Sequence, residues 1–165
     1  MQDHQLSPQA AKYLQDIQSG WKLWLYFFKN LPSALWWGFK VKSASTERTE
    51  ITIPYNWRTQ NPFKSIYFAA LAGAGELSTG VMANLARMSG GDVSMLVLEQ
   101  RAEFVKKANT TITFTCEDGQ AVFETVNKAV STRQPQALTM LGTGRNTSGE
   151  VVARIYITWT FKLRG

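Results

Sequence analysis

The first clear pattern in the chain is a run of apolar residues that recur every three or four positions up to about Asn30. This spacing predicts an amphipathic helix. Ser7 followed by Pro8 matches an N-cap and a first helical residue, and a bend is expected near Gly20. The segment WKLWLYFF is also typical of a membrane-surface anchor, but its few basic residues favour a helix packed over the domain. The apolar positions are Tyr13, Leu14, Ile17, Trp21, Trp24, Phe28 and Leu31.

After Pro32 the period of the pattern changes from three or four residues to two. Apolar residues alternate with polar ones around 37–41 and again around 51–55, which predicts two strands. A polar turn at 43–48 joins them. A loop rich in Asn, Gln and Pro then leads into the central part of the chain.

The central segment predicts a long helix from about Ser65 to Met88, which Gly90 and the glycine after it end. Glu76 is its only charged residue before Arg87. At about 100° per residue, the face around Glu76 consists of small residues and carries no basic partner. These neighbours are Ala69, Ala72, Gly73, Thr79, Gly80 and Ala83.

A face of small residues allows a sheet, a second helix or a ligand to approach the helix closely. A carboxylate held in such a crevice would be partly desolvated, which raises its pKa and strengthens it as a base. The alternative is that Glu76 lies at a solvent-exposed edge or pairs with a basic side chain from another element. Both interpretations stay open at this point.

The second half of the chain is mainly β. Strands are predicted at 93–105, 111–116, 136–143 and 150–163, with a short amphipathic helix at 119–131. The simplest packing is an α+β fold in which the central helix covers one face of a single antiparallel sheet. Cys116 falls on the apolar side of its strand, so a buried thiol is expected there rather than a nucleophile.

Composition limits the kind of partner that this chain can have. The 165 residues are 44% hydrophobic, enough for one domain with a real core, and the formal charge is +6. That charge suits an anionic partner. The cations are scattered, however, so they indicate a mildly basic surface rather than a nucleic-acid stripe.

The scarcity of histidine and cysteine disfavours several classes of functional site. His4 is the only histidine and Cys116 the only cysteine, which argues against a metal centre, a Ser-His-Asp triad and an intrachain disulfide. The first residues do not look like a signal peptide, and no apolar stretch reaches the roughly 18 residues of a spanning helix. We therefore expect a cytoplasmic protein without stable membrane insertion. An enzyme of this kind would work with carboxylates, tyrosines, amides, backbone groups or water.

The order of elements and the segment that starts at Asn61 resemble the hotdog-fold acyl-CoA thioesterases, in the branch of the phenylacetate-pathway and 4-hydroxybenzoyl-CoA enzymes. In that branch the motif N-x-x-G-x-x-H-G-G opens the central helix, and an acid follows 15 residues after the Asn. Asn61 and Glu76 have this separation. Lys64 replaces the first glycine, Tyr67 the histidine, and Phe68-Ala69 the Gly-Gly pair.

The resemblance implies a hotdog domain over 32–165, a sheet wrapped around a long central helix, preceded by an N-terminal helical extension over 1–31. It implies that Glu76 is nucleophile or general base, that Asn61 positions substrate or water, and that the N–H of Ala69, with that of Phe68, holds the thioester oxygen. Tyr67 could donate a hydrogen bond to the carbonyl.

The resemblance also implies a homodimer, or a dimer of dimers, with sites built from both chains. Coenzyme A would enter as part of the substrate, with no separate cofactor and no metal. Its phosphates suggest contacts from basic residues: Arg58, Lys64, Lys106, Lys107 and Arg145. A thioesterase is the leading hypothesis. A non-catalytic hotdog module that binds an acyl or lipid-like ligand is the alternative, and nucleic-acid binding rests on charge alone.

Overall fold

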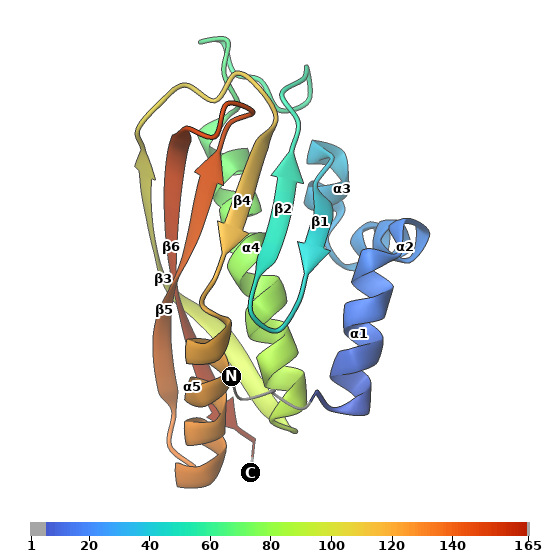
Figure 1. Cartoon of the computed structure of the whole chain (residues 1–165), viewed down its shortest axis with the longest axis vertical. Helices are drawn as coiled ribbons and strands as arrows, with labels where there is room; N and C mark the ends of the chain where they lie inside the picture. The colour runs from blue at the N-terminus through green and yellow to red at the C-terminus, as the bar shows by residue number, and fades with distance from the viewer. Residues whose placement is uncertain (1–5, 165) are drawn as a thin grey trace.

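The computed structural model of the protein describes residues 6–164, so the expectation for His4 falls outside the described part of the chain. Helices and strands follow one another in an α+β order (Figure 1). The helices are α1 (Pro8–Gln18), α2 (Gly20–Asn30), α3 (Pro32–Trp37), α4 (Phe68–Ser89) and α5 (Gly119–Thr132). The strands are β1 (Lys40–Ala44), β2 (Thr49–Ile53), β3 (Val93–Phe104), β4 (Ile112–Cys116), β5 (Gln136–Arg145) and β6 (Val151–Leu163).

The six strands form one sheet in the order β1-β2-β4-β5-β6-β3, and every neighbouring pair is antiparallel. The predicted α+β class with a long helix against an antiparallel sheet is therefore confirmed. Strand β6 follows the predicted alternation, with buried residues on the side that faces the core. Figure 1 shows α4 along one face of the sheet, with β3 at one edge and β1 at the other.

Small residues let α4 approach the sheet closely. A Cβ atom on Gly75 would lie only 2.4 Å from Cγ1 of Ile155 on β6. On the next strand, a Cβ on Gly142 would lie 2.7 Å from Oγ of Ser78. The Thr49 hydroxyl of β2 donates a hydrogen bond of 2.5 Å to the carbonyl oxygen of Ser78. Gly75 of α4 and Gly142 of β5 thus have the packing role that close helix–sheet contact requires.

Replacing Gly75 by alanine should destabilise the fold, although alanine favours helices. The new methyl group would overlap Ile155, and overpacking a core typically costs about 1–3 kcal/mol, more than the roughly 1 kcal/mol gained in helix propensity. Thermal unfolding of Gly75→Ala should therefore begin at a lower temperature than that of the wild type. Gly20→Ala is the matched control, because nothing lies within 4 Å of its added Cβ. Equal stability of Gly75→Ala and wild type would contradict the close packing.

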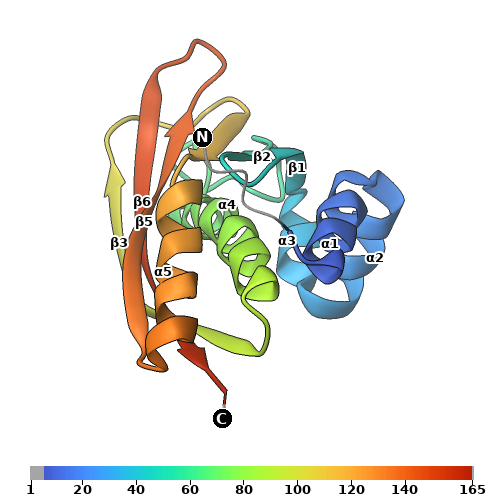
Figure 2. The same ribbon diagram turned by 60° about the horizontal axis from the view of Figure 1, so that its bottom comes forward.

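The predicted N-terminal extension forms two helices, α1 and α2, instead of one bent helix, and the short helix α3 follows from Pro32. Ser7 caps α1 as predicted, since its Oγ accepts a hydrogen bond from the Ala10 N–H. The expected bend is a full break at Ser19, which separates α1 from α2. Figure 2 shows these helices grouped on the side of the molecule away from β3.

The predicted strand around 37–41 is wrong at its beginning. Trp37 ends the short helix α3, Gly38 follows with a left-handed φ of 73°, and the strand begins only at Lys40. The rings of Trp37 and Phe39 lie 5.6 Å apart, and both pack over Gly73 of α4. Trp37 and Phe39 thus pack on the same neighbour although they belong to a helix end and a turn. Their spacing of two residues is the same as that of neighbouring side chains on one face of a strand, which explains the wrong prediction.

No described helix combines the length and the apolar character that crossing a membrane requires.

Candidate active site

Glu76 lies in the third turn of α4 and lines a cavity of about 280 Å³. Helix α4 forms one wall, and the N-terminal helices α1 and α2 form another. Single residues of β1, β3 and β6 complete the lining. The full set is Tyr13, Ile17, Leu23, Tyr26, Phe27, Leu31, Val41, Glu76, Leu77, Gly80, Val81, Asn84, Met95 and Trp159. Glu76 carries the only carboxyl group in a predominantly apolar and aromatic lining.

Burial in this cavity raises the pKa of Glu76 to about 7. No cation offsets the loss of hydration, because Glu76 forms no ion pair within residues 6–164. The proposed pairing with a basic side chain from another element is therefore absent from the described chain. A carboxyl group with a pKa near 7 exchanges protons readily at neutral pH, as a general base must.

Gly80 and Trp159 shape the space around the carboxylate. A Cβ on Gly80 would lie 3.1 Å from Oε1 of Glu76 and 3.4 Å from the ring of Trp159. The indole N–H of Trp159 donates a hydrogen bond of 3.0 Å to the hydroxyl of Thr79. This bond fixes the ring beside α4, and the missing side chain at Gly80 leaves room for the Glu76 carboxylate.

A polar line continues from Glu76 along the same side of α4. Asn84 lies two turns beyond Glu76, and the Tyr13 hydroxyl of α1 hydrogen-bonds to it. Arg87 Nε in turn donates a 2.9 Å hydrogen bond to Asn84 Oδ1. Burial raises the pKa of Tyr13 to about 12, and the hydrogen bond with Asn84 offsets this only in part, so the hydroxyl stays protonated at neutral pH. Tyr13 thus connects the N-terminal extension to the Glu76 cavity.

The residues predicted to hold the thioester oxygen gather at the beginning of α4. Tyr67 is the N-cap and is exposed, and its carbonyl oxygen accepts the N–H groups of Ala70 and Leu71. The N–H groups of Phe68 and Ala69 find no acceptor within the described residues. They remain available at a helix end that favours negative charge.

The Asn61 side chain is engaged in its own loop. Its Oδ1 accepts hydrogen bonds from the N–H of Phe63 at 3.0 Å and from the N–H and hydroxyl of Ser65. Its Nδ2 donates to the Ile66 carbonyl oxygen at 3.4 Å. In the single chain, Asn61 therefore shapes the turn before α4.

The structure separates Glu76 from the other predicted catalytic residues. Ala69 precedes Glu76 by seven residues, which is about 10 Å along a helix axis. Asn61, Tyr67 and Ala69 do not line the Glu76 cavity. A substrate would have to span the distance from the helix beginning to the carboxylate, or a second subunit would have to complete the site. The roles of these residues stay predictions.

Three of the five cations proposed to contact coenzyme A lie at one end of the molecule. The loop that carries Lys64 contacts the loop of Lys106 and Lys107, because Lys107 donates a hydrogen bond to the Phe63 carbonyl oxygen at 3.3 Å. Lys106 pairs with Glu150. These loops adjoin the beginning of α4, at the top of Figure 1. Arg58 lies beside Gly38, and Arg145 ends β5 in the hairpin that also carries Glu150, the partner of Lys106.

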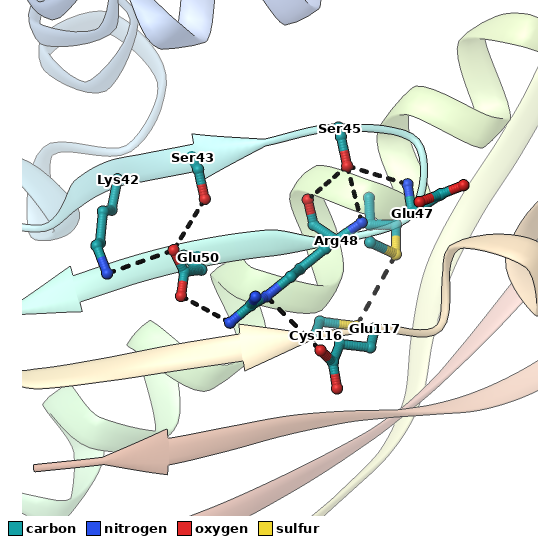
Figure 3. Close-up of polar contacts among 9 residues, drawn as sticks. Lys42, Ser43, Ser45, Glu47, Arg48, Glu50, Cys116 and Glu117 are labelled. Atoms are coloured by element: carbon teal, nitrogen blue, oxygen red, sulfur yellow. Dashed lines mark hydrogen bonds and ion pairs between the residues drawn. The ribbon is translucent and has the colours of Figure 1, made fainter. Parts of the chain in front are cut away.

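A larger hollow, of about 640 Å³, lies on the face of the sheet that points away from α4. Its charges pair with one another: Glu50 lies 2.9 Å from Arg48 and 3.4 Å from Lys42, and Glu117 lies 3.6 Å from Arg48 (Figure 3). Burial disfavours ionisation of Glu50, but Ser43 and the two cations outweigh it and lower the Glu50 pKa.

Cys116 is the buried thiol that the sequence predicted. Its Sγ lies 4.0 Å from Sδ of Met82, and burial raises its pKa to about 12. A thiol with this pKa is protonated at neutral pH and does not act as a nucleophile. Glu76 therefore remains the strongest candidate for chemistry among the described residues.

Two residues of the Glu76 cavity escaped the sequence analysis. Asn84 follows Glu76 by eight residues, a spacing that places both on one side of a helix, so the pattern could have identified it. Tyr13 gave no such signal, because it fits the apolar stripe of α1. Only the tertiary packing of α1 on α4 brings its hydroxyl to Asn84.

Comparison with known proteins places the chain in a family and identifies its fold. A family model described as a domain of unknown function, DUF4442, matches residues 30–161. The search of curated proteins found no significant match. Several of the similar solved structures are described as thioesterases or probable thioesterases, and the likeness confirms the predicted resemblance and the hotdog fold.

Three solved structures illustrate the similarity. A protein of unknown function and probable thioesterase from Pseudomonas aeruginosa has a TM-score of 0.75 at 17% identity, over 90% of this chain and 99% of its own. A protein of unknown function from Chlorobaculum tepidum has a TM-score of 0.75 at 13% identity, with 96% and 98% covered. A thioesterase from Haemophilus influenzae has a TM-score of 0.57 at 14% identity, with 89% and 93% covered.

Proposed function

Because the chain belongs to the DUF4442 family and has the hotdog fold of thioesterase-like proteins, we propose that it hydrolyses an acyl-CoA or a related thioester with Glu76. The observation that carries this proposal is the unpaired carboxylate in an apolar cavity, with its pKa raised to about 7 by burial. Burial without a charged partner destabilises a glutamate that only supports the structure. For a general base or nucleophile, the same burial brings the pKa close to neutral pH, where the group must react.

Glu76 could act in either of two ways. As a general base, its carboxylate takes a proton from water, the hydroxide attacks the thioester carbonyl, and the thiolate leaves and is protonated. As a nucleophile, the carboxylate attacks the carbonyl and expels the thiolate, and water then hydrolyses the resulting anhydride. Both routes give a carboxylic acid and a free thiol, and both require Glu76 to be ionised.

The beginning of α4 suits the oxygen that becomes negative in either route. The free N–H groups of Phe68 and Ala69 point out of the first turn, and the helix dipole adds to their effect. Tyr67 offers a phenolic donor at the same place, and Asn61 holds the loop that precedes it. Lys64, Lys106 and Lys107 nearby would suit the phosphates of coenzyme A.

A homodimer is part of this proposal. Strand β3 pairs only with β6 and leaves its other edge without a partner in the described chain. This edge exposes the apolar side chains of Leu96, Leu98 and Phe104. Long apolar edge strands are normally covered, and antiparallel pairing with β3 of a second copy would cover this one. Phe104 contacts Phe68 at a ring distance of 6.2 Å, so the same edge adjoins the beginning of α4.

The alternative function, binding of an acyl or lipid-like ligand without turnover, has one observation in its favour. The Asn61 amide hydrogen-bonds within its own loop through both Oδ1 and Nδ2. A ligand that only fills the apolar cavity would not need these groups.

Release of free thiol from a panel of acyl-CoAs distinguishes the two functions. The panel should include short, long and aromatic acyl groups, because the cavity lining does not select one. Multiple turnovers on any member of the panel would support hydrolysis. A co-purified acyl ligand together with no turnover on any member would favour the binding module.

Hydrolysis should depend on pH through Glu76. Since only the ionised carboxylate reacts, kcat/KM should rise about tenfold per pH unit below the Glu76 pKa of about 7 and level off above it. The measurement is a pH–rate profile between pH 5 and 9 on the best substrate, in buffers of constant ionic strength. A profile that is flat between pH 5 and 7 would contradict an acid with this pKa as the reactive group.

A further inference from the structure

The outer face of α2 carries large apolar side chains that contact solvent. Trp21 is 65% exposed, Trp24 50%, Leu25 48% and Phe28 63%. The inner side of the same helix is buried through Leu23 and Phe27. We call the four exposed residues the α2 aromatic surface. Exposed apolar groups that gather in this way mark an interaction site more often than scattered single residues do.

The four side chains form one continuous stripe. At about 100° per residue, they cover an arc of about 100° on the side of α2 that faces away from the buried residues. The rings of Trp24 and Phe28 stack at 5.3 Å with an angle of 7° between them. The stripe is thus ordered by its own ring contacts and presents a flat apolar surface to the outside.

Positive charge borders this surface. Lys22 and Lys29 lie on one side of the stripe by the same helical spacing, and α2 contains no acidic residue. Across α1 to α3 the only acid is Asp16, which pairs with Lys22 at 2.5 Å. Lys29 forms no ion pair within residues 6–164. The region therefore complements an anionic surface.

We infer that the α2 aromatic surface docks the protein onto an anionic lipid bilayer, with Trp21, Trp24 and Phe28 in the interface and the lysines at the headgroups. Aromatic rings, tryptophan above all, favour the boundary between headgroups and acyl chains. A helix with such rings beside lysines binds that boundary from the side without spanning the membrane. This inference does not depend on the proposed hydrolysis.

The position of α2 in the fold agrees with this role. Figures 1 and 2 both place α2 on the opposite side of the molecule from β3. Pairing through β3 would therefore leave the α2 aromatic surface free. The inner face of α2, through Tyr26 and Phe27, lines the Glu76 cavity. A docked bilayer would thus lie against the outer side of one cavity wall.

Cosedimentation with vesicles tests the inference directly. The full chain should pellet with vesicles of phosphatidylcholine mixed with phosphatidylglycerol, and much less with vesicles of phosphatidylcholine alone. Trp24→Ser combined with Phe28→Ser should weaken partitioning at least about tenfold, since both rings leave the interface. Lys22→Gln combined with Lys29→Gln should weaken binding to the anionic vesicles about tenfold and abolish their advantage over neutral ones.

Phe63→Ser is the matched control, because Phe63 is 74% exposed but lies in the loop before α4. It should bind vesicles like the wild type, and all variants should keep the wild-type circular dichroism spectrum. Failure of the wild type to bind either vesicle, or undiminished binding by the Trp24/Phe28 variant, would overturn the inference. The inference would also be overturned if the Trp24/Phe28 variant lost a self-associated state of the wild type but bound vesicles equally well. The α2 aromatic surface would then be a contact between copies of the chain.

Discussion

Glu76→Gln should reduce thioester hydrolysis at least about a hundredfold at pH 8. Glutamine keeps the size of the side chain but can neither take a proton from water nor attack a carbonyl. Loss of a general base typically costs 10²–10⁴-fold, and loss of a nucleophile costs at least as much. The measurement is kcat for thiol release on the best acyl-CoA. Glu47→Gln is the matched control, because Glu47 is an exposed loop residue far along the chain from α4.

The same substitution should make the protein more stable at pH 8. The pKa of Glu76 is about 7 in the folded state and about 4.3 for a glutamate in an unfolded chain. Between these values the unfolded state releases a proton that the folded state keeps, so wild-type stability falls as the pH rises from about 4.3 to about 7. Above about pH 7 this loss of wild-type stability has reached its full size. Glu76→Gln lacks this penalty because its side chain is always neutral.

Thermal unfolding at two pH values separates this effect from a general change in packing. At pH 8 the midpoint of Glu76→Gln should exceed that of the wild type by several degrees, and at pH 4 the two should nearly coincide. A residue that lowers stability and is needed for turnover is typical of an active site. Unchanged turnover in Glu76→Gln would remove Glu76 from the mechanism, whatever its effect on stability.

The elements of the core could be predicted from the sequence because their periodicity is set by burial. Strand β6 alternates between buried and half-buried residues from Ala153 to Phe161, since one of its faces packs on α4. The long helix α4 was recognisable by its length and by the glycines after it. Local signals sufficed in both cases, because propensity and tertiary packing favour the same structure.

The N-terminal region could be predicted less well because several packings satisfy the same pattern. Trp37 and Phe39 read as alternating strand residues, but the chain buries them through the end of α3 and a left-handed Gly38. The aromatic residues of α2 fitted a helix stripe, but the sequence could not tell which side faces the domain. Leu23 and Phe27 turned out to be the buried pair.

The site was predictable only in part. The unpaired setting of Glu76 followed from the small residues around it and from the distance to the nearest charges in the sequence. The wall formed by α1, and with it Tyr13, depends on contacts between residues more than sixty positions apart. The hydrogen bonds of Asn61 within its own loop could not be predicted from the sequence either. The N–H and hydroxyl of Ser65 reach Asn61 Oδ1 only in the folded turn.

Breaking the exposed edge of β3 should convert a dimer to a monomer and remove most of the activity. Leu96 is 64% exposed and Leu98 59%, and lysine at both positions would place two positive charges in the proposed pairing of two β3 strands. Edge lysines are a common means of preventing such pairing. Light scattering after size exclusion should report the mass of two chains for the wild type. For Leu96→Lys combined with Leu98→Lys it should report the mass of one chain.

The activity of this double variant is the more informative result, because a site built from both subunits fails when they separate. In the single chain, Glu76 lies about 10 Å along α4 from Ala69, and the Glu76 cavity contains neither Asn61 nor Tyr67. We therefore expect turnover to fall at least about tenfold on monomerisation, while the unfolding midpoint changes little, since the two leucines are solvent-exposed. Trp21→Lys, which changes an exposed aromatic residue of α2 on the opposite side of the molecule from β3, should stay dimeric. A fully active monomer would instead mean that one chain holds the complete site, and that substrate spans the distance between the beginning of α4 and Glu76 within it.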